Sequence, residues 1–459
     1  MFSIFNRHQL SITKQLSVSF LLVIFVGSFL LSLPIMHYPN APATTYLDHL
    51  FTAISMVCVT GLSVFPIAHV YNGFGQLIAL LLIQIGGLGL VTLISVSYFV
   101  LNRKLSLRDQ HLLQSAITYD SANNLKNYLF TIYRVTLIIE SVCSCLLMID
   151  FIPRYGLGNG IFNSLFLSVS AFCNAGFDNL GASSLQGFKT NTLVNLIIAF
   201  LIISGGLGFM VWGNLYHATK HFITSRPKHL RSFTKQLNSH TLLVLETTVA
   251  LLILGTTLSW LLESSNVRTI GQLSFTKQGL VSFFQSVTMR TAGFSTIDYA
   301  HSKNATNLIY IIQMMIGGAP GGTAGGLKVT VVAVLFLLLK SEARGQTQVT
   351  YHFRTIPQKI TRQTLVILIF FFSTLLAAYL LLLEFEPHLS PFSLFFEASS
   401  ALATVGVSMD ITTKLSTAGR IIIMLLMFIG RVGPITVLMA LLQNHQKEVS
   451  YAKTDIILG

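Results

Sequence analysis

Four short glycine segments recur at a near-constant interval along the chain. Their glycines are Gly61, Gly176, Gly293 and Gly406, so the steps between them are 115, 117 and 113 residues. With the two residues that precede each glycine, the segments are Val59-Thr60-Gly61, Asn174-Ala175-Gly176, Thr291-Ala292-Gly293 and Thr404-Val405-Gly406. A period kept over the whole length indicates one structural unit repeated four times.

Each glycine segment has the same kinds of neighbour on either side. An apolar run too short to cross a bilayer precedes it, at 46–59, 160–173, 278–289 and 391–404. Longer apolar runs come before that (16–36, 129–149, 241–262, 365–383) and after the glycine (77–101, 193–216, 308–339, 421–442). About 20 apolar residues span a bilayer, whereas runs of 10–14 are more often re-entrant. The pattern predicts an all-α integral membrane protein. Four fused helix–pore helix–helix repeats would surround one pore, with eight spanning helices and four re-entrant half-helices.

The composition excludes an ordinary soluble enzyme. Of the 459 residues, 52% are apolar and only 10% are charged, against roughly 25% charged in a typical soluble domain. We expect repeat boundaries at 1–125, 126–235, 236–355 and 356–459. The sequence contains no serine-hydrolase, zinc-protease or P-loop motif, so we expect a chain that is not an enzyme and has no organic cofactor.

The basic residues predict the orientation in the membrane. The net charge is +13, which by itself would suit a nucleic-acid partner. However, 18 of the 29 lysines and arginines fall on the side of the predicted spans that holds both termini, and only 7 on the other side. By the positive-inside rule the termini are cytoplasmic and the glycine segments enter from outside. The charge therefore reflects the lipid bilayer, and no nucleic acid is expected.

Glycine loops at the end of short helices suit the binding of a dehydrated cation. Rings of backbone carbonyls can replace its water shell, and glycine permits the backbone angles that point carbonyls at one axis. The C-terminal end of each half-helix adds partial negative charge. We therefore predict a cation-selectivity filter made of the twelve residues of the four segments given above.

The third repeat has an unusual break in its second long run. The break contains six glycines and a proline, which a regular helix does not tolerate. Irregular backbone at membrane depth is buried in protein or lines a water-filled cavity. We predict a gate made of Gly317, Gly318, Ala319, Pro320, Gly321, Gly322, Thr323, Ala324, Gly325 and Gly326, together with Lys328 and Arg431. For the shorter glycine groups at 86–89 and 205–208, close helix packing is the favoured interpretation.

With these features the chain resembles the Trk/Ktr/HKT family of potassium transporters over its whole length, and most of all the membrane subunit of bacterial Ktr systems. The resemblance implies that the four glycines form a potassium filter. It also implies that the third-repeat break is an intramembrane gating loop, and that Arg431 faces the pore. A serine at the first filter glycine goes with sodium transport in this family, and Gly61 stands there. The family further implies a homodimer above a cytosolic ring of nucleotide-binding regulatory subunits.

Four charged side chains have competing interpretations. Arg431 is an electrostatic barrier below the filter or a member of a structural ion pair. Lys328 is a mobile cation of the loop, or it extends to the inner membrane surface. Arg290 is expected to support the filter rather than to contact the ion, and Glu397 to pair with a nearby arginine rather than to bind the ion.

The predicted function is potassium uptake across the plasma membrane. The alternative is a sodium-coupled secondary transporter with alternating access, which commonly has inverted repeats. Here each repeat has an even number of spanning segments, so the repeats run parallel and suit a pore better. The sequence leaves open whether potassium flow depends on sodium.

Overall fold

The computed structural model describes residues 12–89, 125–224 and 236–433. These residues are mostly helical, and the strands among them are β1 (Thr350–Tyr351) and β2 (Arg354–Thr355), an antiparallel pair that forms one small hairpin.

The helices follow the predicted order in all four repeats. The first-type helices are α1 (Ile12–Leu31), α7 (Leu125–Tyr155), α12 (Ser239–Glu263) and α16 (Gln358–Phe385). The pore helices are α2 (Tyr46–Val57), α8 (Leu157–Phe172), α13 (Phe275–Thr288) and α17 (Pro391–Leu402). Short helices α3 (Ile67–Val70), η1 (Pro34–Met36), η3 (Gln186–Phe188), η4 (Tyr299–His301) and η5 (Thr412–Lys414) lie between the longer ones. The predicted all-helical membrane fold is confirmed.

The second helix of each repeat is less regular than the first. In the second repeat it is bent by 100° between α9 (Thr192–Gly206) and α10 (Phe209–Thr224). In the third it is split into α14 (Asn304–Met315) and α15 (Val329–Ala343) by the glycine-rich break. The other two are α4 (Gly73–Leu88) and α18 (Thr417–Val432). The predicted ends of these two runs, 90–101 and 434–442, lie outside the described residues.

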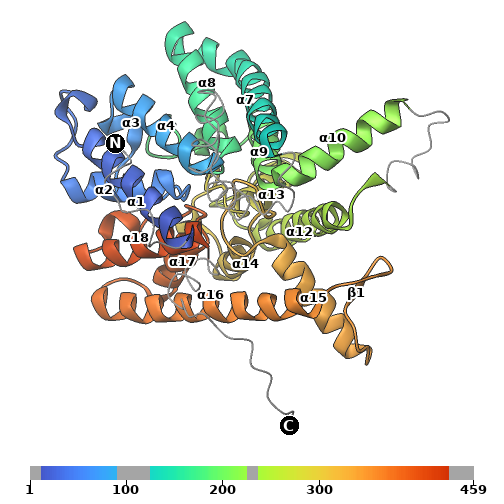
Figure 1. Ribbon diagram of the computed structural model, residues 1–459. Helices are drawn as coiled ribbons and strands as arrows, with labels where there is room; N and C mark the ends of the chain where they lie inside the picture. Colours follow the sequence, from blue (N-terminus) through green and yellow to red (C-terminus); the bar gives the residue numbers. More distant parts are fainter. Residues whose placement is uncertain (1–11, 90–124, 225–235, 434–459) are drawn as a thin grey trace.

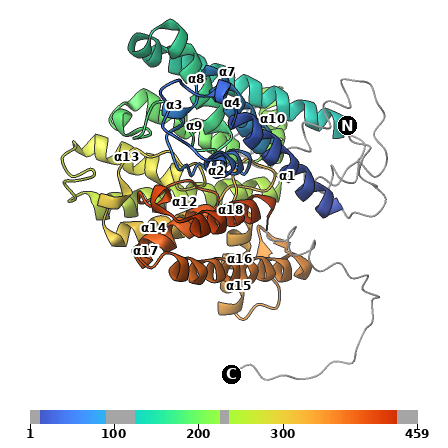
Figure 2. The same cartoon turned by 90° about the vertical axis from the view of Figure 1, so that its left-hand side faces the viewer.

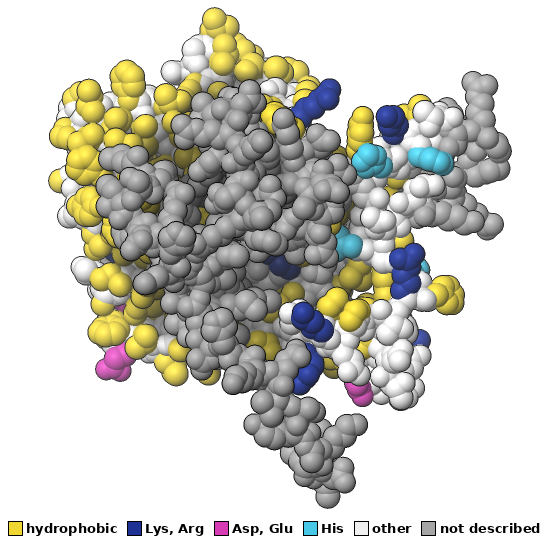
Figure 3. Space-filling view, in the orientation of Figure 1, with side chains coloured by type: hydrophobic (Ala, Val, Ile, Leu, Met, Phe, Trp, Pro, Cys, Tyr) yellow, Lys and Arg dark blue, Asp and Glu magenta, His cyan; other side chains and the backbone are white. Residues whose placement is uncertain are grey.

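By length and composition, three described helices could each cross a membrane, and the bent pair α9–α10 would make a fourth span. They are Phe130–Tyr155, Ser239–Glu263 and Gln358–Phe385. Their surfaces carry many exposed apolar side chains, among them Ile253, Leu261, Ile369 and Leu376. In Figure 3 hydrophobic side chains cover much of the left and upper rim of the molecule. Such a rim suits contact with lipid tails.

The four repeats close into a ring. The second helix of each repeat packs on the pore helix of the next: α4 on α8, α9 on α13, α14 on α17, and α18 back on α2. Figure 1 shows this order around the centre of the molecule, with α2 and α4 at the left, α8 at the top, α12 at the right and α16 at the bottom. In the view turned by 90°, α1 lies obliquely across the molecule beside α2 and α4 (Figure 2).

The pore helices bury one face in the centre of this ring. A phenylalanine nine or ten residues before each filter glycine is fully buried: Phe51, Phe166, Phe284 and Phe396. A buried phenylalanine contributes roughly 1.5–3 kcal/mol by leaving water. This packing fixes the C-terminal ends of the pore helices, and those ends position the glycine segments.

Candidate functional site: a ring of backbone loops

The four predicted filter segments have the same unusual backbone. In each, the first residue and the glycine both have positive φ: 57° and 103° at Val59 and Gly61, and 58° and 68° at Asn174 and Gly176. The third and fourth segments repeat this, with 64° at Thr291, 86° at Gly293, 52° at Thr404 and 91° at Gly406. For a β-branched residue a positive φ is a genuine outlier. Such strain persists only where the surrounding structure imposes it, and it clusters at functional sites.

The segments lie directly against one another in cyclic order. A Cβ atom added at Gly61 would lie 2.7 Å from the carbonyl oxygen of Ala175, and one added at Gly176 would lie 2.7 Å from that of Ala292. In the same way, Gly293 abuts the carbonyl of Val405, and Gly406 abuts that of Thr60. The twelve predicted residues are thus brought together, with one carbonyl per repeat in contact with the filter glycine of the preceding repeat around the ring.

Hydroxyl groups of serine or threonine residues on the pore helices form hydrogen bonds with the backbone of these segments or of the residues that follow them. Ser55 Oγ and Ser400 Oγ each accept a hydrogen bond of 3.0 Å from the amide of the filter glycine six residues later. Ser170 Oγ accepts from Phe177 N at 3.1 Å. The third repeat differs, because Thr288 Oγ1 donates to the carbonyl of Phe294 at 2.7 Å. These serines were not predicted from the sequence, although their fixed spacing of six residues before the glycine could have identified them.

A vestibule of about 440 Å³ opens above the ring. It is lined by all four filter glycines and by the residues that follow them, including the carboxylates Asp178, Asp298 and Asp410. Burial raises the pKa of Asp178 to about 6, although the amide of Leu180, which donates to it at 3.1 Å, favours the ionised form. Carboxylates around a narrow mouth concentrate cations there.

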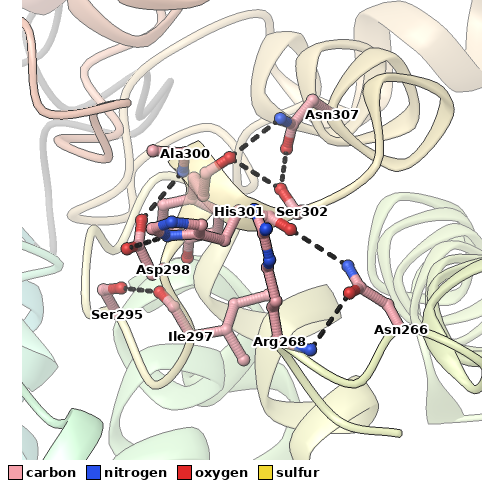
Figure 4. A network of polar contacts seen from close by, with 10 residues as sticks. Asn266, Arg268, Ser295, Ile297, Asp298, Ala300, His301, Ser302 and Asn307 are labelled. Carbon is pink, nitrogen blue, oxygen red and sulfur yellow. Dashed lines mark hydrogen bonds and ion pairs between the residues drawn. The ribbon is translucent and has the colours of Figure 1, made fainter.

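The outer loop of the third repeat is fixed by its own network of polar contacts (Figure 4). Asp298 Oδ1 accepts from Ala300 N at 2.9 Å, and Asp298 Oδ2 pairs with His301 Nδ1 at 2.6 Å. Asn307 Nδ2 donates to the carbonyl of Tyr299 at 3.0 Å, and Asn266 Nδ2 donates to that of His301 at 3.0 Å. These contacts hold the part of the vestibule wall that the third repeat forms in one conformation.

The predicted gate residues form a closed hairpin below the ring. Its base is held by hydrogen bonds from Gly317 N to Leu327 O (2.8 Å) and from Leu327 N to Met315 O (3.1 Å). Its tip binds the second repeat at the point where α9 bends, because Ala319 N donates to Gly206 O at 2.8 Å and Thr323 N to Gly205 O at 3.1 Å.

Close packing accounts for several glycines of this hairpin. A Cβ atom at Gly318 would lie 2.6 Å from Gly206 O, and one at Gly322 would lie 2.9 Å from Gly205 O. The same holds for the shorter groups, since Gly86, Gly205 and Gly430 each press on the carbonyl of the last pore-helix residue. The packing interpretation of 86–89 and 205–208 is confirmed at Gly86 and Gly205, although the second repeat also bends there.

Both cations of the predicted gate contact this hairpin. Arg431 donates to the carbonyls of Thr323 (2.5 Å) and Gly87 (3.1 Å), and also to that of Gly86. Among the described residues, no carboxylate lies within ion-pair distance of Arg431. The guanidinium therefore connects repeats one, three and four through backbone oxygens. Lys328 Nζ turns back and donates to Ala324 O at 2.7 Å, which fits a loop cation rather than one that extends to the membrane surface.

Two further charged side chains, Arg290 and Glu397, can be compared with their predicted contacts. Arg290 is buried and donates to Thr248 Oγ1 (3.3 Å) and Gly317 O (3.4 Å), so it links α12 to the base of the hairpin, and its support of the filter stays a prediction. The predicted arginine partner of Glu397 is wrong. Glu397 is fully buried and instead accepts from Thr412 Oγ1 at 2.5 Å.

Comparison with known proteins places the chain among cation transporters. The TrkH family model, described as cation transport protein, matches residues 4–451. The Ktr system potassium uptake protein B of Vibrio alginolyticus is 35% identical, over 96% of this chain and 94% of the relative. The protein of the same name from Bacillus subtilis is 33% identical, over 97% and 96%. The potassium/sodium uptake protein NtpJ of Enterococcus hirae is 34% identical, over 99% and 98%.

A solved structure has the same fold. The potassium transporter TrkH of Vibrio parahaemolyticus superposes with a TM-score of 0.72 at 16% identity, covering 95% of this chain and 86% of that one. The family match and the near full-length relatives agree with the ring of four filter-like loops. The chain belongs to the TrkH family of cation transport proteins.

Proposed function

We propose that this chain is the pore-forming subunit of a potassium uptake system in the plasma membrane. The observation that carries the proposal is the cyclic contact of four backbone segments with matched positive-φ geometry. Each segment places a main-chain carbonyl against the filter glycine of the preceding repeat. Carbonyl rings of this kind dehydrate and select monovalent cations. The relatives named as potassium uptake proteins support potassium as the ion.

The residues in this proposal have distinct roles. Ions enter from the acidic vestibule and bind at the carbonyls of Val59, Thr60 and Gly61 and of their counterparts in the other repeats. Below the ring, the hairpin of residues 317–326 blocks passage until it moves, with Lys328 and Arg431 as the cations that hold it. We place the repeat boundaries at 125, 235 and 355, and the order of the helices supports this division.

We also propose how the protein is assembled and regulated. The names of the Ktr relatives imply a system of more than one component. A homodimer bound to a cytosolic nucleotide-binding subunit agrees with this, with both termini in the cytoplasm. Movement of α15 by such a partner would pull on Lys328, the residue that immediately precedes α15.

The test of the filter is the substitution Gly61→Ser. The φ of +103° at Gly61 strains any side chain, and an added Cβ atom would meet the Ala175 carbonyl. Uptake of potassium and of sodium into proteoliposomes would be measured side by side. We expect weaker discrimination between the two ions. An unchanged ratio in a normally assembled variant would count against this filter.

Uptake into the same vesicles also tests the alternative function, a sodium-coupled transporter. The name of the Enterococcus relative, a potassium/sodium uptake protein, motivates this alternative. A pore conducts potassium down its own gradient with sodium absent from both sides. Obligatory coupling predicts no uptake under that condition.

A further inference from the structure

The third filter segment, residues 291–293, is held differently from the other three. In repeats one, two and four a serine stands six residues before the filter glycine, and its carbonyl accepts a hydrogen bond of 2.8 Å from the middle residue of the segment. The third repeat has the buried Val287 at that position. Here Ala292 N and Gly293 N both donate to the Thr288 carbonyl, at 2.9 and 3.4 Å. No serine hydroxyl is therefore available at this position to contact the third segment.

A buried glutamine and a buried tyrosine join the chain after this segment to its own pore helix. Gln285 lies on α13, and Tyr299 lies six residues after Gly293. Tyr299 OH donates to Gln285 Oε1 at 2.7 Å, and Gln285 Nε2 donates to Thr296 Oγ1 at 2.8 Å. Both ends of the Gln285 amide are thus bonded to residues that follow the filter glycine.

The main chain and the ring of Tyr299 are fixed as well. Its carbonyl accepts hydrogen bonds from Ser302 Oγ at 2.8 Å and from Asn307 Nδ2 at 3.0 Å (Figure 4). The centre of its ring lies 5.9 Å from that of Phe396, on the pore helix α17 of the fourth repeat. Tyr299 therefore connects the third segment to α13, to the beginning of α14 and to the neighbouring repeat.

On its inner side the same segment lies against the hairpin. Cβ atoms at Gly317 and Gly326 would lie 3.3 and 3.4 Å from Thr291 Cγ2. Arg290, which precedes Thr291, donates to Gly317 O at 3.4 Å. In the proposed mechanism, movement of the hairpin would therefore disturb the third segment directly, and the contacts of Tyr299 would hold the outer end of that segment in place.

We propose that Gln285 and Tyr299 are positioning residues for ion selectivity, which hold the third filter segment at the spacing that potassium requires. A carbonyl ring discriminates between ions through the number and placement of its oxygens. Hydrogen bonds from surrounding residues keep such a site in its productive geometry. In the third repeat this pair takes the place of the absent serine, and the role rests on the proposed potassium-uptake function. The corresponding positions of the other repeats hold different pairs: Ala53 and Ile67, Ser168 and Ala182, Ala398 and Thr412.

The test removes the tyrosine hydroxyl and leaves the ring. Tyr299→Phe breaks the hydrogen bond to Gln285 and keeps the packing on Phe396. Tyr310→Phe is the matched control, because Tyr310 is also fully buried and its hydroxyl lies 2.7 Å from Ser259 Oγ, on α12 rather than on a pore helix. Both variants should lose a similar amount of thermal stability, because each loses one buried hydrogen bond.

Ion binding is measured apart from transport. The melting temperature of the purified protein would be followed as KCl or NaCl replaces N-methylglucamine chloride at constant ionic strength. The half-effective concentration of sodium divided by that of potassium reports the discrimination between the two ions. We expect this ratio to fall about fivefold in Tyr299→Phe and to stay unchanged in Tyr310→Phe.

An unchanged ratio in Tyr299→Phe would overturn the inference, and so would an equal fall in Tyr310→Phe. If Tyr299→Phe does not assemble, Thr296→Val takes its place, because it removes the other hydroxyl that Gln285 contacts. An unchanged ratio in that variant would likewise overturn the inference.

Gln285→Met shows whether the two residues act together. This substitution removes both hydrogen bonds of the amide. Adding Tyr299→Phe to it should lower the ratio no further, because both substitutions break the same contact. Additive losses would mean that Gln285 and Tyr299 act separately, and would contradict the proposed pair.

A transport arm measures how sodium competes with rubidium uptake into proteoliposomes. Sodium should inhibit Tyr299→Phe at about fivefold lower concentration than it inhibits the unaltered chain. If the unaltered chain binds potassium selectively but takes up no rubidium, the proposed function is wrong, whereas a fall of the binding ratio in Tyr299→Phe would still support the positioning role.

Discussion

The filter ring and the hairpin below it are built in opposite ways. The ring uses four near-identical segments, each hydrogen-bonded to its own pore helix and in contact with the next segment. The hairpin occurs in the third repeat and is held by Gly205 and Gly206 of the second repeat and Arg431 of the fourth. In the proposed mechanism, symmetry therefore serves the part that surrounds an ion, and asymmetry serves the part that moves. A blocking element needs only one copy, because one loop closes a narrow passage.

The largest effect should come from crowding the ring. Gly406→Ala would place a methyl group against the Thr60 carbonyl and 2.8 Å from Gly61 Cα, at a φ of +91°. A distortion costing about 3 kcal/mol would reduce ion occupancy roughly 100-fold. We expect potassium uptake in proteoliposomes to fall by about that factor.

Gly345→Ala is the matched control. Gly345 also has a positive φ, of +64°, but nothing lies near the position of an added Cβ atom. It should lose about 1–2 kcal/mol of stability from backbone strain alone and keep its uptake. Full activity of Gly406→Ala would show that the ring is not the ion path.

The next largest effect should come from removing the tip of the hairpin. A Cβ atom at Gly318 would lie 2.7 Å from Ala324 Cβ, and Gly317 lies against the carbonyl of Gly325. The two arms are therefore adjacent, so deleting residues 319–324 can be closed by joining Gly318 to Gly325. We expect normal assembly, faster potassium uptake and weaker dependence on a cytosolic regulatory subunit.

Uptake of the deletion variant would be compared in vesicles with and without that subunit. If the deletion variant assembles correctly but conducts no faster than the unaltered chain, the hairpin serves only in packing and the gate lies elsewhere.

A smaller effect is expected at Arg431. Arg431→Ala removes the hydrogen bonds that tie the hairpin tip to the first repeat and removes a positive charge below the filter. Both changes should favour cation passage, and we expect a several-fold rise in potassium uptake or a lower KM.

Arg431→Lys serves as the comparison, since it keeps the charge but cannot span several carbonyls as the guanidinium does. Equal uptake by the alanine variant, the lysine variant and the unaltered chain would show that Arg431 has no part in gating.

The smallest effect concerns pH at the vestibule. Burial raises the pKa of Asp178 from its ordinary 3.8 to about 6. The carboxyl group is thus mostly protonated at pH 5 and mostly ionised at pH 7, so its attraction for cations grows as the external pH rises. We expect the KM for potassium to fall by roughly twofold over this range. Asp178→Asn should lose this dependence, and a variant that retains it would assign the titration to another group.

The repeating parts of the fold could be predicted from local sequence. The expected pore helix at 391–404 is observed at Pro391–Leu402, and the one at 46–59 is observed at Tyr46–Val57. Each depends on a continuous apolar run that ends at a glycine whose backbone geometry other residues rarely adopt. The interval between the glycines supplied the number of repeats, because a period is a property of the chain itself.

Only the tertiary structure decided what the buried charges contact. Arg431 meets residues 108 and 345 positions away in the chain, and Glu397 meets a hydroxyl 15 positions away instead of an arginine. The helix bend at 207–208 and the hairpin that packs into it likewise arise from contact between two repeats. A local sequence pattern indicates which conformation a backbone segment prefers. The partner of a buried polar group depends instead on which distant oxygen the packed ring brings within reach.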